Sequence, residues 1–217
     1  MKDLDFDLYD LPSTLPLLAV QGAVLLPRTQ LPIPIYDLDH LIMVFDVLKE
    51  HQMIGVVQPR IDKVSPQDYV ATFKTGCAGK VVDFNEVEEG RFLVTLKGVC
   101  RFEITEEITH KSGYRQARVS YSRYNLDCVE DIDFSCDRPR LLKALRDYFK
   151  LVNMTPNWQE IDQISNDKLI TALAMVCPLE AREKQAFLET PHPKDQSQLI
   201  TTFFELATLD GVSPTCH

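Results

Sequence analysis

The residues of this chain with the most direct chemical meaning are a Gly-Lys pair, five histidines and six cysteines. Gly79-Lys80 has the order found in phosphate-binding loops, but Val81 replaces the Ser or Thr that holds magnesium, and Lys74 stands where the first glycine belongs. The histidines form no HExxH motif, and no serine lies in a GxSxG turn. These motifs predict neither nucleotide binding nor hydrolysis, so we expect no catalytic activity.

The cysteines are scattered along the chain without a CxxC pair or a nearby histidine. A zinc site or a disulfide framework normally shows such spacing, so we expect free thiols, no bound metal and no cofactor. The six are Cys77, Cys100, Cys128, Cys136, Cys177 and Cys216.

A basic and aromatic segment spans residues 108–126, which contain no Asp or Glu. Phosphate contacts and base stacking would come from Arg115, Arg118, Tyr121 and Arg123. The whole chain has a net charge of −9, which repels phosphate backbones and anionic lipid. Nucleic acid and membranes are therefore not expected as partners, and RNA binding through residues 108–126 stays as the alternative function.

The composition is that of a folded protein with a substantial core, since 45% of the 217 residues are hydrophobic. No apolar run approaches the ~18 residues that a membrane span requires. The N-terminus, MKDLDFDLYD, is acidic where a signal peptide is basic and then apolar. A cytoplasmic location is the expectation.

The elements that must position any site begin with short runs, broken by Gly and Pro, that predict strands over residues 15–20, 23–26 and 31–36. Pro32 and Pro34 lack an N–H, which places the third strand at a sheet edge. A helix follows with Asp39 as its expected N-cap. Its apolar face contains Leu41, Val44, Phe45 and Leu48.

The next strands are expected over residues 53–58, where Pro59 ends the strand, and in two hairpins. The first hairpin pairs 76–87 with 91–98, and the second pairs 100–108 with 114–124. Strands at this spacing predict a mostly antiparallel, closed or nearly closed barrel with one helix.

From residue 135 onward the apolar period is helical. Helices are expected after Pro139, after the cap Ser165, over 179–189 and over 195–209 with Gly211 as its C-cap. The predicted organisation is α+β: a β domain over 1–125, an acidic connector over 126–136 and a four-helix unit over 137–217.

Three ordered stretches carry a resemblance to a known family. The first is the proline-bounded opening LPLLAVQGAVLLPRTQLPI at 15–33. The second comprises residues 54–58, 76–81, 90–92 and 96–102, and the third comprises residues 169–178 with 183–186. Together they resemble the N-terminal, substrate-binding domain of Lon proteases, and Gly98-Val99-Cys100-Arg101-Phe102 resembles the family's GxxRF stretch. We interpret Gly98, Arg101 and Phe102 as structural: a turn glycine, an arginine paired across the barrel and a core aromatic.

The resemblance implies a PUA-like pseudo-barrel followed by a helical bundle, as a stand-alone member without the ATPase and peptidase domains. It also implies a non-catalytic module that recognises unfolded or degron-bearing polypeptides, with a protease as a further partner. An enzyme whose pocket carries no known motif is the third alternative.

A protein that recognises polypeptides needs an exposed apolar patch or an open strand edge. The candidate binding elements are the proline-rich strand near residues 31–36 and the loops at Pro27-Arg28 and Pro59-Arg60. The competing explanation is that these loops are ordinary turns with solvated arginines. The candidate residues are Pro27, Arg28, Tyr36, Pro59 and Arg60.

Overall fold

The computed structural model describes residues 10–64, 70–88, 90–109, 111, 113–129, 132 and 134–210. The chain divides into two compact units, Met1–Glu130 (unit 1) and Asp131–His217 (unit 2). The division falls within residues 126–136, for which the sequence predicts a connector. Unit 1 carries the strands and unit 2 is helical, so the α+β class is confirmed.

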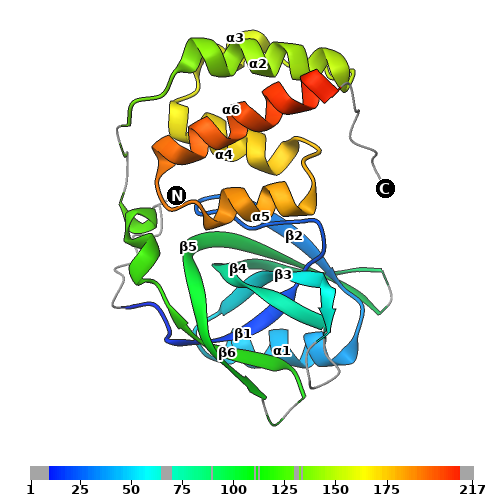
Figure 1. Ribbon diagram of the computed structural model, residues 1–217. Coiled ribbons are helices and arrows are strands. Elements are labelled where there is room, and N and C mark those ends of the chain that lie inside the picture. The colour runs from blue at the N-terminus through cyan, green and yellow to red at the C-terminus, as the bar shows by residue number, and fades with distance from the viewer. Residues whose placement is uncertain are drawn as a thin grey trace. The chain divides into compact units, whose positions relative to one another are not determined.

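Unit 1 is a six-stranded sheet in the order β2-β5-β4-β3-β1-β6, and β5 also pairs with β6. Because of this extra pairing the sheet closes on itself, as Figure 1 shows. Only β1 and β3 run parallel among the pairs of described strands. The strands are β1 Thr14–Ala19, β2 Gln30–Ile35, β3 Met53–Val64, β4 Val70–Glu88, β5 Arg91–Thr109 and β6 Arg115–Ser120.

β5 is one continuous strand, whereas the sequence predicts two strands with a turn at Gly98. Its first part, 92–97, pairs with β2, and its last part, 103–109, pairs with β6. The ladder with β4 shifts register between the pairs Ala78–Cys100 and Gly79–Gly98, which indicates a bulge. The glycine therefore marks an irregularity inside a strand, and the prediction of a turn was wrong.

Residues 23–26 form a buried loop and not the predicted strand. Val24, Leu25 and Leu26 are nearly fully buried, which explains why the stretch has a strand-like composition. The loop is tied to β5 by two backbone hydrogen bonds, from Arg28 N to Gly98 O (2.8 Å) and from Gly98 N to Thr29 O (2.9 Å).

Two further boundaries differ from the predictions. β3 runs past Pro59, which occupies a register shift, because a proline is tolerated at such an irregularity. Helix α1, Leu38–Lys49, is capped by Asp37 and not by Asp39: the Asp37 Oδ1 accepts from His40 N at 2.8 Å. Met43, Val44 and Val47 form the buried face of α1.

The edge strand β2 has an unusual hydrogen-bonding pattern. Its ladder with β5 must use Leu31, Ile33 and Ile35, since Pro32 and Pro34 cannot donate. The outward-directed backbone positions of β2 therefore include two consecutive sites without an N–H.

Residues Ser122–Cys128 form a short 3-10 helix, η2, where the sequence predicts the end of a strand and the start of the connector. Tyr124, which is 1% exposed, lies at a kink in this helix where its own backbone is non-helical (φ −119°, ψ 30°). Asp127, predicted in the connector, thus lies within unit 1.

Five helices lie in the described part of unit 2, one more than predicted. The missed helix, α3, has six residues and buries only Ile161, so it shows no apolar period. Tyr148 of α2 and Phe204 of α6 pack with ring centroids 4.6 Å apart. Gly211, the predicted C-cap, lies outside the described residues. The helices are α2 Arg138–Leu151, α3 Trp158–Gln163, α4 Asn166–Val176, α5 Ala181–Glu189 and α6 Pro193–Asp210.

Candidate functional site

An exposed apolar surface lies on unit 1, where α1 meets the β4–β5 hairpin. We call it the aromatic patch; it consists of Tyr36, Leu38, Phe45, Phe84 and Phe92. Tyr36 is 79% exposed, Leu38 68% and Phe45 45%, while the two hairpin phenylalanines are half-buried. Large apolar side chains at this exposure on neighbouring elements are a common mark of a binding surface.

The contacts between rings join the helix to the hairpin. Phe45 packs edge-on against Phe84 with centroids 5.6 Å apart, and Phe84 stacks on Phe92 at 5.4 Å. Leu38 and Phe45 are seven residues apart and so share one helix face. Ile35, the last residue of β2, pairs with Phe92, and Tyr36 follows it directly. Figure 1 shows β2 leading into α1 on the side toward which the β4–β5 hairpin projects.

Of the five predicted rim residues, only Tyr36 lies in the aromatic patch. Pro59 and Arg60 belong to the continuous strand β3 and are half-buried, so the loop predicted there does not exist. The Arg60 guanidinium lies over the Phe73 ring, 5.4 Å from its centroid.

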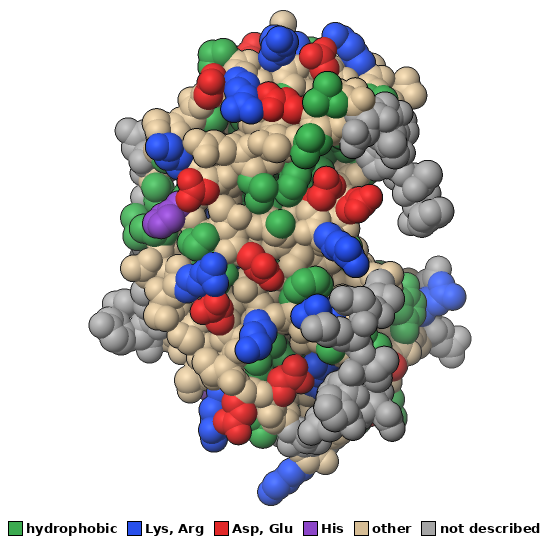
Figure 2. Space-filling model, viewed as in Figure 1, with side chains coloured by type: hydrophobic (Ala, Val, Ile, Leu, Met, Phe, Trp, Pro, Cys, Tyr) green, Lys and Arg blue, Asp and Glu red, His purple; other side chains and the backbone are tan. Residues whose placement is uncertain are grey.

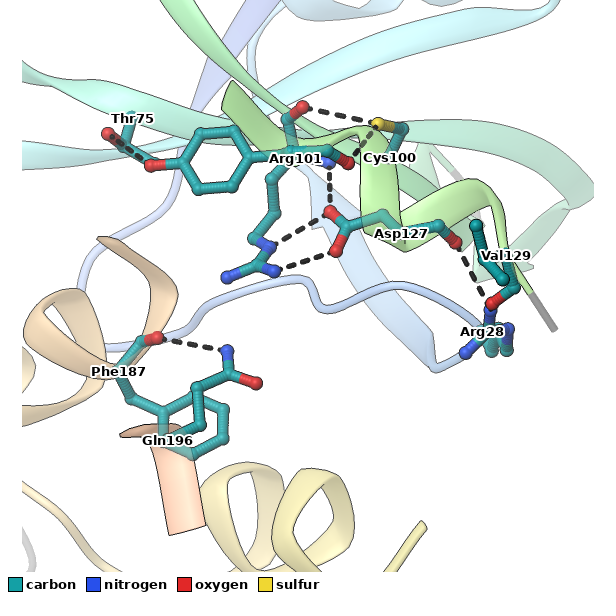
Figure 3. A network of polar contacts seen from close by, with 9 residues as sticks. Arg28, Thr75, Cys100, Arg101, Asp127, Val129, Phe187 and Gln196 are labelled. Carbon is teal, nitrogen blue, oxygen red and sulfur yellow. Dashed lines mark hydrogen bonds and ion pairs between the residues drawn. The ribbon is translucent and has the colours of Figure 1, made fainter. Parts of the chain in front are cut away.

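Pro27 and Arg28 lie in the loop that binds β5. The backbone of Arg28 is left-handed, with φ 65°, and its side chain is exposed but engaged. Its Nη2 donates to the carbonyls of Asp127 (3.2 Å) and Val129 (Figure 3). Since these carbonyls lie at the end of η2, Arg28 anchors a helix terminus.

Phe84 and Phe92 were not predicted as site residues, and Phe45 was predicted only as part of the apolar face of its helix. The apolar arc of α1 is wider than the buried face formed by Met43, Val44 and Val47. From the width of this apolar arc, the exposure of Phe45 could have been predicted. Nothing in the sequence around Phe84 and Phe92 distinguishes them from core residues. Apolar residues at alternate positions of a strand are expected to face the core, and only the folded sheet shows which face is exposed.

The arginines described in the basic segment 108–126 do not form a free cationic surface. Each of its three candidate arginines forms an ion pair with a glutamate of β5: Arg115–Glu107 (2.7 Å), Arg118–Glu106 (2.6 Å) and Arg123–Glu103 (2.8 Å). The face seen in Figure 2 likewise shows Lys and Arg interspersed with Asp and Glu.

Tyr121, the predicted stacking residue, is 9% exposed. Its hydroxyl donates to Pro12 O at 2.9 Å, and burial raises its pKa. The ring therefore belongs to the core of unit 1 and does not offer a stacking platform.

The GxxRF stretch forms the structural centre of unit 1. Phe102 is fully buried, and a Cβ on Gly98 would lie 2.0 Å from Leu26 O. Arg101 donates from its backbone N and its Nε to Asp127 Oδ2, both at 2.9 Å, and from Nη2 to Oδ1 at 2.7 Å (Figure 3). Its guanidinium also lies over the Tyr124 ring at 4.6 Å. These residues hold strand, loop and η2 together.

A pocket of about 300 Å³ opens in unit 1 beside the end of α1. Its polar lining includes Asp46, Glu50, His51 and Tyr114. Burial, and then the charges of Asp46 and Glu50, raise the pKa of Tyr114, so its phenol keeps its proton at neutral pH. This arrangement offers no activated nucleophile.

A second pocket, about 480 Å³, lies in unit 2 at the start of α4. Arg138 in its lining donates to Asn166 Oδ1 (2.7 Å) and Ile161 O (2.6 Å). Its guanidinium thus joins α2 to α3 and to the first residue of α4.

In the described residues, no group of three His, Cys, Asp or Glu side chains is placed to hold a metal ion. None of the helices described is long and apolar enough to cross a membrane.

Comparison with known proteins gives consistent matches. The family described as the ATP-dependent protease La (LON) substrate-binding domain matches residues 14–205. The Lon protease of Anaeromyxobacter dehalogenans is 24% identical over 194 residues, which cover 88% of this chain and 23% of that protein. The Lon protease of Cytophaga hutchinsonii is 25% identical over 194 residues, with 87% and 23% covered. The chain thus spans about a quarter of the length of these curated relatives.

Two solved structures share the fold. The Lon N-terminal domain protein from Xanthomonas campestris has a TM-score of 0.65 at 18% identity, covering 88% of this chain and 99% of the other. The N-terminal domain of Mycobacterium avium complex Lon protease has a TM-score of 0.62 at 14% identity, covering 88% and 98%. With the family match extending through most of both units, the chain belongs to the Lon substrate-binding domain family.

Proposed function

We propose that this protein is a non-catalytic module that binds unfolded polypeptides through the aromatic patch. The observation that carries the proposal is the exposure of Tyr36, Leu38 and Phe45, together with the packing of Phe45 against Phe84, which stacks on Phe92. Membership of a substrate-binding domain family supports it, since polypeptide side chains are the natural occupants of such a surface.

The physical basis is the burial of apolar side chains of the polypeptide against these rings. Each square ångström of apolar surface removed from water contributes roughly 25 cal/mol, and aromatic pairs add favourable edge and stacking geometry. An unfolded chain exposes aliphatic and aromatic residues that a folded protein buries, so the patch discriminates in favour of unfolded states.

Recognition by side chains is favoured over strand addition at β2. An added strand needs regularly spaced donors and acceptors on the edge it joins. The outward positions of β2 at Pro32 and Pro34 have no N–H, so that edge is a poor template.

The family membership extends the proposal to partners and setting. We infer that the bound polypeptides include degron-bearing chains, that they are passed to a protease, and that the protein acts in the cytoplasm with a PUA-like barrel as its β domain. The matched relatives are Lon proteases, which is the basis for naming a protease as the recipient.

RNA binding is not favoured by the described surface. The arginines that would contact phosphates are neutralised by Glu103, Glu106 and Glu107. Binding of RNA would have to break those ion pairs, and the free energy of breaking them would offset part of the electrostatic free energy gained from phosphate contacts.

The test is titration of a fluorescently labelled, permanently unfolded, carboxymethylated protein. The double variant Tyr36→Ser/Phe45→Ser is expected to bind at least about tenfold more weakly, which corresponds to about 1.4 kcal/mol. The matched control is Val176→Ser, which removes an apolar side chain that is 69% exposed in unit 2. Equal binding by the double variant and the wild type would refute the patch as the site; binding of single-stranded RNA instead would support the alternative.

A further inference from the structure

Two cysteine thiols meet inside unit 1. Cys100 lies on β5 and is fully buried, and Cys128 is the last residue of η2 and half-buried. Cys128 packs against the hydrophobic cluster that contains Cys100, and the interaction with the Cys128 side chain raises the pKa of the Cys100 thiol. We propose that Cys100 and Cys128 are a redox-sensitive pair that forms a reversible disulfide between β5 and η2.

The surrounding contacts already hold the strand and the helix at close approach. Cys100 Sγ donates to Tyr124 O at 3.6 Å, one turn before Cys128 (Figure 3). On the other side, the adjacent residues Arg101 and Asp127 are joined by three hydrogen bonds. These contacts hold the β5 segment around Cys100 against η2 without a covalent link.

Among the other described cysteines, Cys77 and Cys177 are buried, and Cys136, half-buried like Cys128, lies in unit 2. Cys77 is buried on β4, where burial raises its pKa far above its ordinary value. Cys177 in unit 2 is buried, which raises its pKa to about 12. Cys136 is half-buried in unit 2. Buried thiols of this kind react slowly, since the thiolate is the reactive form.

Within the pair, the two thiols have different tasks. The interaction with the Cys128 side chain, followed by burial, raises the pKa of Cys100, so this thiol keeps its proton. Cys128 is the more exposed of the two and therefore meets an oxidant first. Cys100 then acts as the resolving thiol.

The oxidant is a hydroperoxide. The sulfur of Cys128, as its thiolate, attacks one peroxide oxygen; the O–O bond breaks, water leaves after protonation, and a sulfenic acid forms. The sulfur of Cys100 then attacks the Cys128 sulfur, the S–O bond breaks, and the leaving hydroxide departs as water with the Cys100 proton. The sulfurs lose two electrons in total and the peroxide gains them, giving one disulfide and two waters from hydrogen peroxide.

The disulfide would join η2, the last described helix of unit 1, to the middle of β5, where β5 pairs with β4. η2 ends two residues before the division between the units, so the disulfide would hold the point at which the chain leaves unit 1. We expect an upward shift of the thermal midpoint of unit 1 on oxidation, reversed by dithiothreitol.

The experiment exposes the full chain to hydrogen peroxide, blocks remaining thiols with N-ethylmaleimide and maps cross-linked peptides by mass spectrometry without reduction. The expected result is loss of two hydrogens with Cys100 linked to Cys128 as the dominant product in the wild type and in the Cys136→Ser control. Cys128→Ser should lose the cross-link and the thermal shift, and its half-buried position makes it the variant that keeps the fold. Dominant sulfinic acid at Cys128, or a cross-link to another cysteine, would overturn the proposal.

Discussion

Arg101 is the residue whose environment most clearly separates a structural role from a binding role. Its side chain and that of Asp127 are only 3% and 6% exposed, and the guanidinium lies over the Tyr124 ring. A charge at this depth is tolerated because the guanidinium donates two hydrogen bonds to the Asp127 carboxylate and lies over the Tyr124 ring. The arginine of the GxxRF stretch therefore stabilises unit 1 and is not free to bind a polypeptide.

The first prediction concerns that ion pair. Replacing Asp127 with Ala leaves the buried Arg101 without its carboxylate, and we expect the free energy of unfolding of unit 1 to fall by about 3–5 kcal/mol. The measurement is urea unfolding followed by hydrogen exchange to assign the loss to unit 1. Glu106→Ala is the matched control, because Glu106 and Arg118 are 59% and 64% exposed, and it should cost less than about 1 kcal/mol. Similar losses in both variants would contradict a special role for the buried pair.

At the scale of elements, β5 organises unit 1 because it has a different partner at each end. β2 covers its first part and β6 its last, and the change takes place around Gly98. There the loop at Leu26 approaches so closely that its carbonyl occupies the space of a side chain. Absence of a Cβ, and not a turn, is the reason for the glycine.

The second prediction follows from this approach. Gly98→Ala places its Cβ against backbone, which cannot rotate away, so the free energy of unfolding should fall by about 3 kcal/mol. The control is Gly22→Ala, where φ is +71° and no atom lies within 4 Å of the added Cβ; only the left-handed backbone cost of about 1 kcal/mol applies. Thermal and urea unfolding of both variants provide the comparison, and a harmless Gly98→Ala would show that the loop moves away at little cost.

Local patterns predicted most element positions, while partners across the fold were not predictable. β1, β2, α1 and four helices of unit 2 lie close to where the apolar period and the prolines place them, although Asp37 and not Asp39 caps α1. The partner of Arg101 was expected across the barrel, yet Asp127 was assigned to a connector, because a 3-10 helix has no distinct apolar period. Phe84 and Phe92 join the patch because of the register in which β4 pairs with β5. A single sequence does not specify that register.

The whole molecule carries a net charge of −9, but the proposed binding surface is apolar. The two features have different consequences for affinity. Charge acts at long range and is screened by salt, whereas burial of apolar surface depends little on ionic strength and is strengthened by excluded salts such as sulfate. Polypeptide binding by the aromatic patch should therefore depend little on ionic strength and should be strengthened by sulfate.

The third prediction is that the affinity for an unfolded polypeptide of near-zero net charge changes by less than about threefold between low and high sodium chloride. Sodium sulfate should tighten it, and calorimetry at several temperatures should give a negative heat-capacity change, because apolar surface leaves water on binding. The control ligand is the same polypeptide with its aromatic residues replaced by serine, which should bind weakly at every salt concentration. A steep loss of affinity with sodium chloride would instead indicate recognition by charge, and would move the binding surface away from Tyr36, Leu38 and Phe45 to the paired arginines of β6 and η2.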